Sequence, residues 1–291
     1  METVRAFLIK KDHLSPTTPV TVKRLEGGFW NKVYRIQGNG VDWVFKSFSG
    51  KADKPSLYPK LPESEAKALE FLNSHDIAPT FIAYYPANHD HPANLLYKFL
   101  PGQMWQGKVA DVGSLLKRLH NLVPPTSFRT LAYEPESLLK EGDKLLCACV
   151  EDKAALTLKT LRPDIKSVQA PHRLSLIHTD VWHGNIISSA GKHYLIDWQC
   201  PGLGDPTEDI WTFLRSGYQK LLGHDLFTKA QELSFFNRYR GDAERLETLH
   251  SYYSYRLAAH CLMRKQDLAD SKPAVARVYA HLFEHHLKAL S

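Results

Sequence analysis

The chain has 291 residues, of which 43% are hydrophobic and 23% are charged. This balance is typical of a folded soluble protein, excludes disorder as the first interpretation, and leaves room for one large domain or two lobes. The formal net charge is +6 without a dense basic run, which disfavours a nucleic-acid-binding protein and leaves a solvated basic surface or an anionic ligand as explanations.

The N-terminal third is predicted to form strands and one helix. The alternating apolar residues of 41–45 indicate a half-buried strand. The preceding Gly38-Asn39-Gly40 predicts a hairpin turn, because Asn-Gly tolerates the positive φ that such turns need. The predicted strands are 20–22, 33–36, 41–45, 81–85 and 95–99, with a proline-rich loop over 51–62 and a helix over 63–74.

After a hinge at Pro101-Gly102, the pattern becomes mainly helical. A short strand over 174–177 leads into a polar loop, and 186–188 with 193–196 predict a hairpin that turns at Ala190-Gly191. The predicted helices are 109–122, 135–150, 152–161 and nearly everything from 206 to the end. We therefore expect an α+β protein with a β-rich N-lobe (1–100) and a mostly helical C-lobe (101–291).

The four cysteines, at positions 147, 149, 200 and 261, include no CxxC pair. This argues against a disulfide framework and a zinc site, and reduced thiols indicate the cytosol. The N-terminal segment is not a signal peptide, and no apolar run is long enough to span a membrane. We therefore expect a cytoplasmic protein without a membrane partner; the number of subunits is not predicted.

The segment HTDVWHGN at 178–185, followed twelve residues after Asn185 by Ile196-Asp197-Trp198, carries the strongest chemical signal. One carboxylate can accept or orient the proton of an attacking hydroxyl. An oxygen-donor pair can hold Mg²⁺, which prefers hard oxygen ligands and completes its shell with phosphate and water. Phosphoryl transfer mainly needs positioning and charge neutralisation, so this spacing predicts a phosphotransferase.

These motifs closely resemble those of the aminoglycoside phosphotransferase and choline kinase family, which are protein-kinase-like small-molecule kinases. Further matches follow in the same order along the chain. They are LEGGFWNKVYRI (25–36), ESEAKALEFL (63–72), YKFLPGQ (97–103), LLKRLHNL (115–122) and GLGDPTEDI (202–210). The resemblance implies a two-lobed protein-kinase-like fold that uses ATP and Mg²⁺.

The resemblance also implies roles for individual residues. Asp180 would be the catalytic base or would orient the hydroxyl, and Asn185 and Asp197 would bind Mg²⁺. Lys46, held by Glu65, would contact the α- and β-phosphates. The backbone around Gly27, Gly28 and Phe29 would cover the phosphates, and Phe99 would lie at the hinge beside ATP.

Some residues keep alternative interpretations. Glu63 competes with Glu65, because a carboxylate in the first turn also favours the helix dipole. His178 is expected to hydrogen-bond within the loop, and Asp209 to brace that loop from the start of a helix. His183 either faces the substrate or packs the loop. Asp205 is either a turn residue or a substrate contact.

The acceptor is expected between the catalytic loop and the C-terminal helices. Aromatic rings there could hold an amine through cation–π attraction, although most such rings are core residues. Trp182 is the best candidate; the others are Trp198, Trp211, Tyr218, Tyr252, Tyr253 and Tyr255. Acidic residues are present but not dense: Glu208, Asp209, Asp242, Glu244 and Glu247.

The sequence therefore favours a small-molecule kinase that acts on an amino alcohol, a sugar or a vitamin-like alcohol, and an aminoglycoside remains possible. A catalytically silent nucleotide-binding protein is disfavoured because the base, the metal ligands and the lysine are all present. A protein kinase is disfavoured because His-Thr precedes Asp180 and Trp-Gln follows Asp197, where protein kinases have His-Arg and Phe-Gly.

Overall fold

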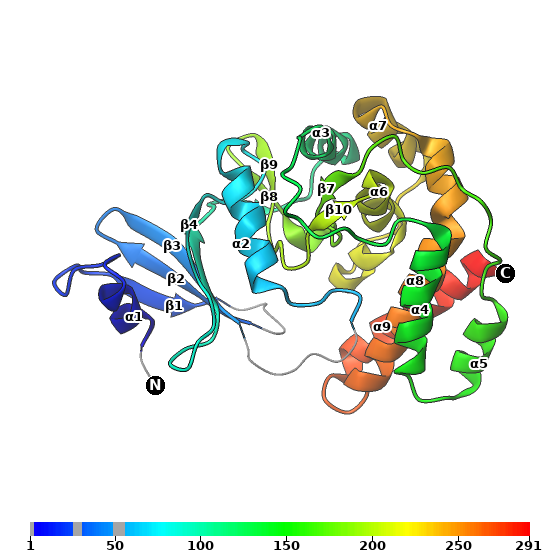
Figure 1. Cartoon of the computed structure of the whole chain (residues 1–291), viewed down its shortest axis with the longest axis horizontal. Coiled ribbons are helices and arrows are strands. Elements are labelled where there is room, and N and C mark those ends of the chain that lie inside the picture. Colours follow the sequence, from blue (N-terminus) through cyan, green and yellow to red (C-terminus); the bar gives the residue numbers. More distant parts are fainter. Residues whose placement is uncertain (1–2, 26–30, 49–55) are drawn as a thin grey trace.

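The computed structural model describes residues 3–25, 31–48 and 56–291. The N-terminal part is built on a five-stranded antiparallel sheet with the order β1-β2-β3-β5-β4, and the C-terminal part is mostly helical (Figure 1). The strands of the sheet are β1 (Thr21–Arg24), β2 (Lys32–Gly38), β3 (Val41–Ser47), β4 (Phe81–Tyr85) and β5 (Asn94–Lys98). The predicted α+β organisation is confirmed.

The hairpin formed by β2 and β3 positions Lys46, the first side chain of the candidate site along the chain. Asn39 and Gly40 both have positive φ, of 48° and 76°, and this is the geometry in which a tight turn matches the twist of its strands. The resulting register sets Val33 opposite Lys46 near the end of β3. Lys46 thereby lies on the face of the sheet that meets the rest of the molecule.

Two helices flank this sheet. The predicted helix is confirmed as α2 (Pro62–Phe71), which lies between the sheet and the helical part (Figure 1). The helix α1 (Val4–Lys10) was not predicted. It is capped by Thr3, whose side chain accepts from the Ala6 amide, and it packs the ring of Phe7 against Phe45. Seven residues make only two turns, too short for a clear helical periodicity.

Two small sheets frame the loop at 178–185. One pairs β7 (Ser175–Ile177) with β10 (Gly202–Gly204). The other joins β6 (Gln103–Met104), β8 (Ile186–Ser189) and β9 (Lys192–Leu195). The β8–β9 hairpin was predicted. The strands β6 and β10 were not, because pairs of two and three residues depend on their tertiary partners.

The long helix α8 (Ala243–Leu268) is the centre of the C-terminal part and packs against α4 and α9. Sixteen of its residues are buried, which explains why its sequence shows no single apolar face. No helix of the described residues has the length and apolar content needed to cross a membrane. The remaining helices are α3 (Val109–His120), α4 (Pro135–Cys147), α5 (Lys153–Thr160), α6 (Pro206–Arg215), α7 (Lys229–Tyr239) and α9 (Pro273–Leu290), with short 3₁₀ turns η1 (Leu72–Ser74), η2 (His183–Asn185) and η3 (Tyr218–Leu222).

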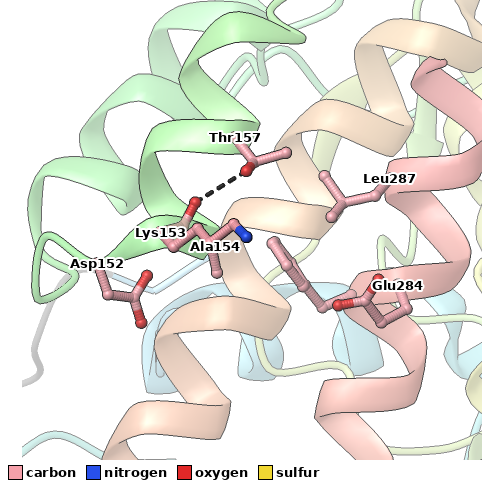
Figure 2. Close-up of a pocket in the computed structure, with 7 residues that line it drawn as sticks. Asp152, Lys153, Ala154, Thr157, Glu284 and Leu287 are labelled. Atoms are coloured by element: carbon pink, nitrogen blue, oxygen red, sulfur yellow. Dashed lines mark hydrogen bonds between the residues drawn. The ribbon is translucent and has the colours of Figure 1, made fainter.

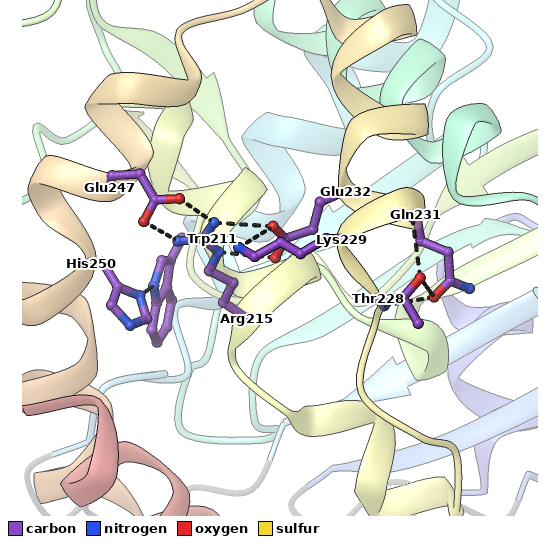
Figure 3. A network of polar contacts seen from close by, with 8 residues as sticks. All are labelled: Trp211, Arg215, Thr228, Lys229, Gln231, Glu232, Glu247 and His250. Carbon is purple, nitrogen blue, oxygen red and sulfur yellow. Dashed lines mark hydrogen bonds and ion pairs between the residues drawn. The ribbon is translucent and has the colours of Figure 1, made fainter.

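Arg215 links three of these helices (Figure 3). From the end of α6, its guanidinium donates to Glu232 of α7 at 3.1 Å and to Glu247 of α8 at 2.6 and 2.8 Å. Beside it, Trp211 donates its indole N–H to His250 at 2.9 Å. The side chains of Arg215 and Glu232 are only 12% and 13% exposed, so solvent screens this pair weakly.

We expect Arg215→Met to lower the free energy of unfolding at neutral pH by about 2–4 kcal/mol, because it leaves the half-buried Glu232 carboxylate without its main cation. Arg215 holds the pKa of Glu232 below its usual value although burial raises it. The stability from this pair is therefore present at neutral pH and is lost as pH falls through the lowered pKa. Denaturant unfolding of the wild-type protein and the variant at pH 7 and pH 4 measures the difference in their free energies of unfolding. This difference should be smaller at pH 4.

The matched control is Glu247→Gln, because Glu247 is 61% exposed and exposed ion pairs contribute about 0–1 kcal/mol. Equal losses in the two variants would contradict the special role of the buried Arg215–Glu232 pair.

Candidate active site

The backbone of the loop at 178–185 is fixed by Asp209, in the first turn of α6. Its fully buried carboxylate accepts the amide of His178 at 2.9 Å and the amide of Thr179 at 2.7 Å. The same carboxylate is 3.1 Å from Nε2 of His120, on α3. Asp209 thus ties the loop to two helices and holds Thr179 at a φ of 73°, an unfavourable value for a β-branched residue.

His178 also stabilises this loop, through hydrogen bonds of both ring nitrogens and packing of its ring. Its Nε2 lies 2.9 Å from the carbonyl oxygen of Ile196, and its Nδ1 accepts the amide of Asp180 at 3.3 Å. The ring is fully buried against Trp198, with 4.6 Å between ring centroids. Because both ring nitrogens are occupied, His178 holds the loop beside the residues that follow β9.

The loop presents Asp180 and Asn185 side by side. The Asn185 Nδ2 group donates to the Asp180 carbonyl oxygen and to Oδ2 of its carboxylate, both at 2.9 Å. Burial, and after it the negative charge of Asp197, raise the pKa of Asp180 to about 7. A carboxyl group with that pKa can accept a proton near neutral pH.

Lys46, Glu65 and Asp197 meet on the facing side. The Lys46 ammonium donates to both oxygens of Glu65, at 2.9 and 2.8 Å, and to Oδ1 of Asp197 at 2.5 Å. Lys46 is 4% exposed and Glu65 only 1%. The structure therefore brings together residues from β3, from α2 and from the segment after β9, and it pairs Lys46 with Glu65; the alternative, Glu63, instead forms an exposed ion pair with Lys67.

The charges of this group are strongly coupled. Burial raises the pKa of Glu65 to about 7, although Lys46 opposes this. Burial also acts on Asp197, but the positive charge of Lys46 outweighs it and lowers the pKa of Asp197. The two carboxylates raise the pKa of Lys46 despite its burial. Asp197 therefore stays ionised and Lys46 stays charged at neutral pH.

The donor atoms of Asn185 and Asp197 fit a Mg²⁺ ion. Because Nδ2 of Asn185 is committed to Asp180, its Oδ1 is the atom left to face a ligand. Oδ1 of Asp197 is bonded to Lys46, which leaves Oδ2 of a side chain that is 42% exposed. One amide and one carboxylate oxygen suit Mg²⁺, which takes its other ligands from phosphates and water. Among the described residues no cluster of three His, Cys, Asp or Glu side chains could hold a metal.

Trp182 and His183 point in different directions. Trp182 lies over Gly184, where an added Cβ would come within 2.5 Å of the indole ring, and its ring centroid is 6.3 Å from that of Tyr218. His183 is 7% exposed and stacks on Phe227, 5.5 Å away. Burial lowers the pKa of His183 to about 4, so the ring is neutral. It packs the loop, as one of the two interpretations expects, and its contact with a substrate stays a prediction.

Asp205 and Glu208, the other two predicted substrate contacts, are buried and paired with arginines. Asp205 is fully buried at the start of α6, where one oxygen accepts the Thr207 amide and the other binds Arg245. Glu208 is 5% exposed and accepts from Arg256 at 2.6 Å. Both carboxylates anchor α6 to α8. Contact of either one with a substrate stays a prediction.

Of the remaining predicted nucleotide-binding residues, the structure describes only Phe99. Gly27, Gly28 and Phe29 lie outside the described residues. Phe99 follows β5; its amide donates to the Asp42 carbonyl at 2.9 Å, and the Arg35 guanidinium lies 3.6 Å from its ring centroid. Its contact with a nucleotide stays a prediction.

Most of the predicted acceptor-side rings belong to the core. Trp198, Trp211 and the tyrosines of α8 at 252, 253 and 255 are at most 3% exposed. Sequence reasoning missed Tyr58, which lies beside Tyr218, and His260, which lies beside Tyr58. Tyr58 sits in a proline-rich segment and His260 on a helix that is buried all round, so neither has a local signal.

A separate pocket of about 450 Å³ opens between α5 and α9 (Figure 2). Two of its polar side chains form hydrogen bonds within α5: Asp152 caps the helix, and Thr157 donates to the Lys153 carbonyl at 2.8 Å. The lining residues are Asp152, Lys153, Ala154, Thr157, Phe283, Glu284 and Leu287. None of them belongs to the predicted site, so this pocket is not the candidate active site.

We expect Asp209→Asn to disturb the loop, because an amide side chain can accept at only one of its two positions while the carboxylate here accepts two backbone amides. Leaving a buried amide unpaired costs about 1–3 kcal/mol. Hydrogen exchange should show faster exchange at His178 and Thr179. Unchanged protection of both amides would contradict this bracing role.

Comparisons with known proteins agree with this geometry. The sequence profile of the phosphotransferase enzyme family matches residues 21–247. A choline/ethanolamine kinase family protein from Mesorhizobium loti has 20% identity and a TM-score of 0.63, with 98% of this chain and 97% of that chain covered. Comparison with curated proteins gives no significant match.

Two further solved structures share the fold. A choline kinase from Streptococcus pneumoniae has 17% identity and a TM-score of 0.60, covering 96% of this chain and 98% of that one. A thermostable mutant of an aminoglycoside phosphotransferase has 14% identity and a TM-score of 0.65, covering 98% and 99%. The predicted protein-kinase-like fold and family resemblance are thus confirmed. The chain belongs to the phosphotransferase enzyme family.

Proposed function

We propose that this protein is an ATP- and Mg²⁺-dependent phosphotransferase that transfers the γ-phosphate to a hydroxyl group of a small molecule. The observation that carries the proposal is the convergence of Lys46, Glu65 and Asp197, within hydrogen-bond distance, beside a loop that pairs Asp180 with Asn185. The raised pKa of Asp180, about 7, suits a proton acceptor and supports the phosphotransferase over a silent nucleotide-binding protein.

Each side chain has a role in this reaction. The acceptor oxygen forms a bond to the γ-phosphorus, the bond to the bridging oxygen of ADP breaks, and the hydroxyl proton passes to the Asp180 carboxylate. Asn185 and Asp197 hold Mg²⁺, which neutralises phosphate charge when it is bound. Lys46, oriented by Glu65, contacts the α- and β-phosphates.

The proposal extends to the two lobes. ATP would bind between residues 1–100 and 101–291, beside the hinge at 96–102 that includes Phe99, with the backbone at Gly27, Gly28 and Phe29 over its phosphates. The acceptor would be a small alcohol such as an amino alcohol, a sugar or a vitamin-like alcohol. Solved structures of similar fold include choline, ethanolamine and aminoglycoside kinases. We place the reaction in the cytoplasm, where ATP and reduced thiols are found.

A coupled ADP-release assay tests the proposal. Mg·ATP is supplied with choline, ethanolamine, thiamine, sugars, amino-acid alcohols and aminoglycosides in turn. Acceptor-dependent ADP release that requires Mg²⁺ and is lost in Asp180→Asn is the expected result. ATP binding without any release, against these compounds and against a mixed metabolite extract, would favour the silent nucleotide-binding protein instead.

A further inference from the structure

Three side chains from distant parts of the sequence gather next to the catalytic loop. Tyr58 comes from the segment before α2, Tyr218 from the turn η3, and His260 from the middle of α8. The segment before α2 runs across from the helical part of the molecule (Figure 1), where the Leu61 amide donates to the Gln199 carbonyl at 3.0 Å. This crossing brings Tyr58 to α8.

The Tyr58 ring contacts each of the other two rings. The Tyr218 hydroxyl donates to the Tyr58 hydroxyl at 3.0 Å, and the Tyr58 ring meets His260 edge-on with 5.2 Å between centroids. Tyr218 also contacts Trp182 of the catalytic loop, at 6.3 Å between centroids. The negative charge of Asp180 contributes to the raised pKa of both tyrosines, after burial. The tyrosine cluster, defined as Tyr58, Tyr218 and His260, therefore lies beside the catalytic carboxylate.

Two hydrogen-bonding positions of the tyrosine cluster are left for a ligand. Tyr58 accepts the Tyr218 proton, so its own O–H remains to be donated. His260 is only 4% exposed, yet its Nδ1 has no hydrogen-bond partner. A buried polar atom without a partner is costly, and a bound ligand is one way to satisfy it. Burial lowers the pKa of His260 to about 3, so the ring is neutral.

One oxygen of the buried Glu208 carboxylate is paired with Arg256, while its Oε2 atom has no hydrogen-bond partner in the part of the chain that the structure describes. Glu208 binds Arg256 at 2.6 Å, and Arg256 also binds Glu141 at 2.9 Å. Arg256 lies one helical turn before His260 on α8. Within the described residues, the tyrosine cluster therefore offers neutral rings, a hydroxyl and an imidazole, and Asp180 is the carboxylate that borders it.

We propose, on the basis of the phosphotransferase function above, that the tyrosine cluster binds the acceptor and selects an uncharged polyhydroxy compound over an ammonium compound. A hydroxyl group both donates and accepts, so it can satisfy the Tyr58 O–H and the neutral imidazole together. An ammonium group only donates and would leave the Tyr58 proton without an acceptor. It would also meet the positive charges of Arg264 and Arg256, which act on His260.

The first test sorts acceptors by charge without assuming their identity. A small-molecule extract of cultured cells is separated at neutral pH on a cation exchanger into an unretained fraction and a retained, cationic fraction. Each fraction is incubated with the protein, Mg²⁺ and γ-labelled ATP. The expected result is label on a compound of the unretained fraction that a neutral-sugar panel then identifies.

The outcomes separate this inference from the proposed function. Label transferred only to a compound of the cationic fraction would overturn the selection for an uncharged acceptor while leaving the phosphotransferase intact. Label transferred in neither fraction would overturn the phosphotransferase itself, and this inference with it.

The second test removes one hydroxyl. Tyr58→Phe keeps the ring and should lower kcat/KM for the acceptor about tenfold, because a hydrogen bond to substrate is lost, with the KM for ATP unchanged. The matched control is Tyr85→Phe, whose hydroxyl binds His13 in the N-terminal sheet. Equal acceptor kinetics in Tyr58→Phe and the wild-type protein would overturn the role of the cluster. The charge test uses the wild-type protein, so it decides the question even if Tyr58→Phe unfolds.

Discussion

Replacing Asp180 by asparagine is expected to lower kcat by about 10²–10⁴-fold and to leave ATP affinity close to that of the wild-type protein. The asparagine side chain has nearly the same shape but cannot take up the acceptor proton. The Lys46, Glu65 and Asp197 contacts that would hold the nucleotide do not involve Asp180. Single-turnover phosphoryl transfer and nucleotide titration measure the two quantities separately.

The same substitution should stabilise the protein at alkaline pH. The folded-state pKa of Asp180 is raised to about 7, against about 3.9 in an unfolded chain. A carboxyl group with a raised pKa favours folding most below the unfolded value, and this contribution is lost as pH rises through the folded value. We expect Asp180→Asn to raise the free energy of unfolding by about 1–3 kcal/mol at pH 8 and by almost nothing at pH 4.

Measuring both turnover and stability of Asp180→Asn distinguishes a loss of catalysis from unfolding. A variant that loses turnover while its denaturation midpoint at pH 8 rises has not lost activity by unfolding. Near-normal turnover in Asp180→Asn would contradict its assignment as the proton acceptor. A pH-independent change in stability would contradict the raised pKa.

The loop at 178–185 could be predicted because its arrangement depends on residues that are close in sequence. The spacing of Asp180, Asn185 and Asp197 follows from a short loop and one hairpin, and the hairpin turn at 190–191 has the positive φ that its residues allow. The pairing of Lys46 with Glu65 came from the family resemblance. Its physical basis, burial of both charges against each other, is visible only in the fold.

The sequence did not predict the side-chain partners of two carboxylates and a histidine, because these partners are distant in sequence. Asp205 and Glu208 look like free acids in the sequence, but they form ion pairs with Arg245 and Arg256 of α8. His183 lies within the loop motif, yet its ring turns into an aromatic cluster with Phe227. A sequence pattern specifies where the backbone of a residue lies more reliably than which neighbours its side chain meets.

The acceptor side was the least predictable part for the same reason. Aromatic content singled out rings that turned out to fill the core around α8, because a central helix needs large apolar groups on every side. Tyr58 comes close to Asp180 only because its segment crosses to the helical part before α2 begins. The proposed acceptor site thus depends on long-range contacts, while the proposed reaction type rests on short motifs.

Replacing Asp197 by alanine is expected to weaken Mg·ATP binding by about 10²-fold, because it removes the carboxylate oxygen proposed to hold the metal. ATP without Mg²⁺ should bind as well as before or better. The reason is that Lys46, which now donates to Asp197 at 2.5 Å, would be free to turn toward a phosphate while keeping Glu65.

Titrating the wild-type protein and the variant with fluorescent ATP, with and without Mg²⁺, measures the change in each affinity. The control is Asp225→Ala, which removes an exposed carboxylate and should leave both affinities unchanged. Equal weakening of ATP binding in the presence and absence of Mg²⁺ would show that Asp197 orders the Lys46 side chain rather than the metal. A loss confined to Mg·ATP, with tighter binding of the free nucleotide, is expected only if Asp197 binds the metal and restrains Lys46 in the empty protein.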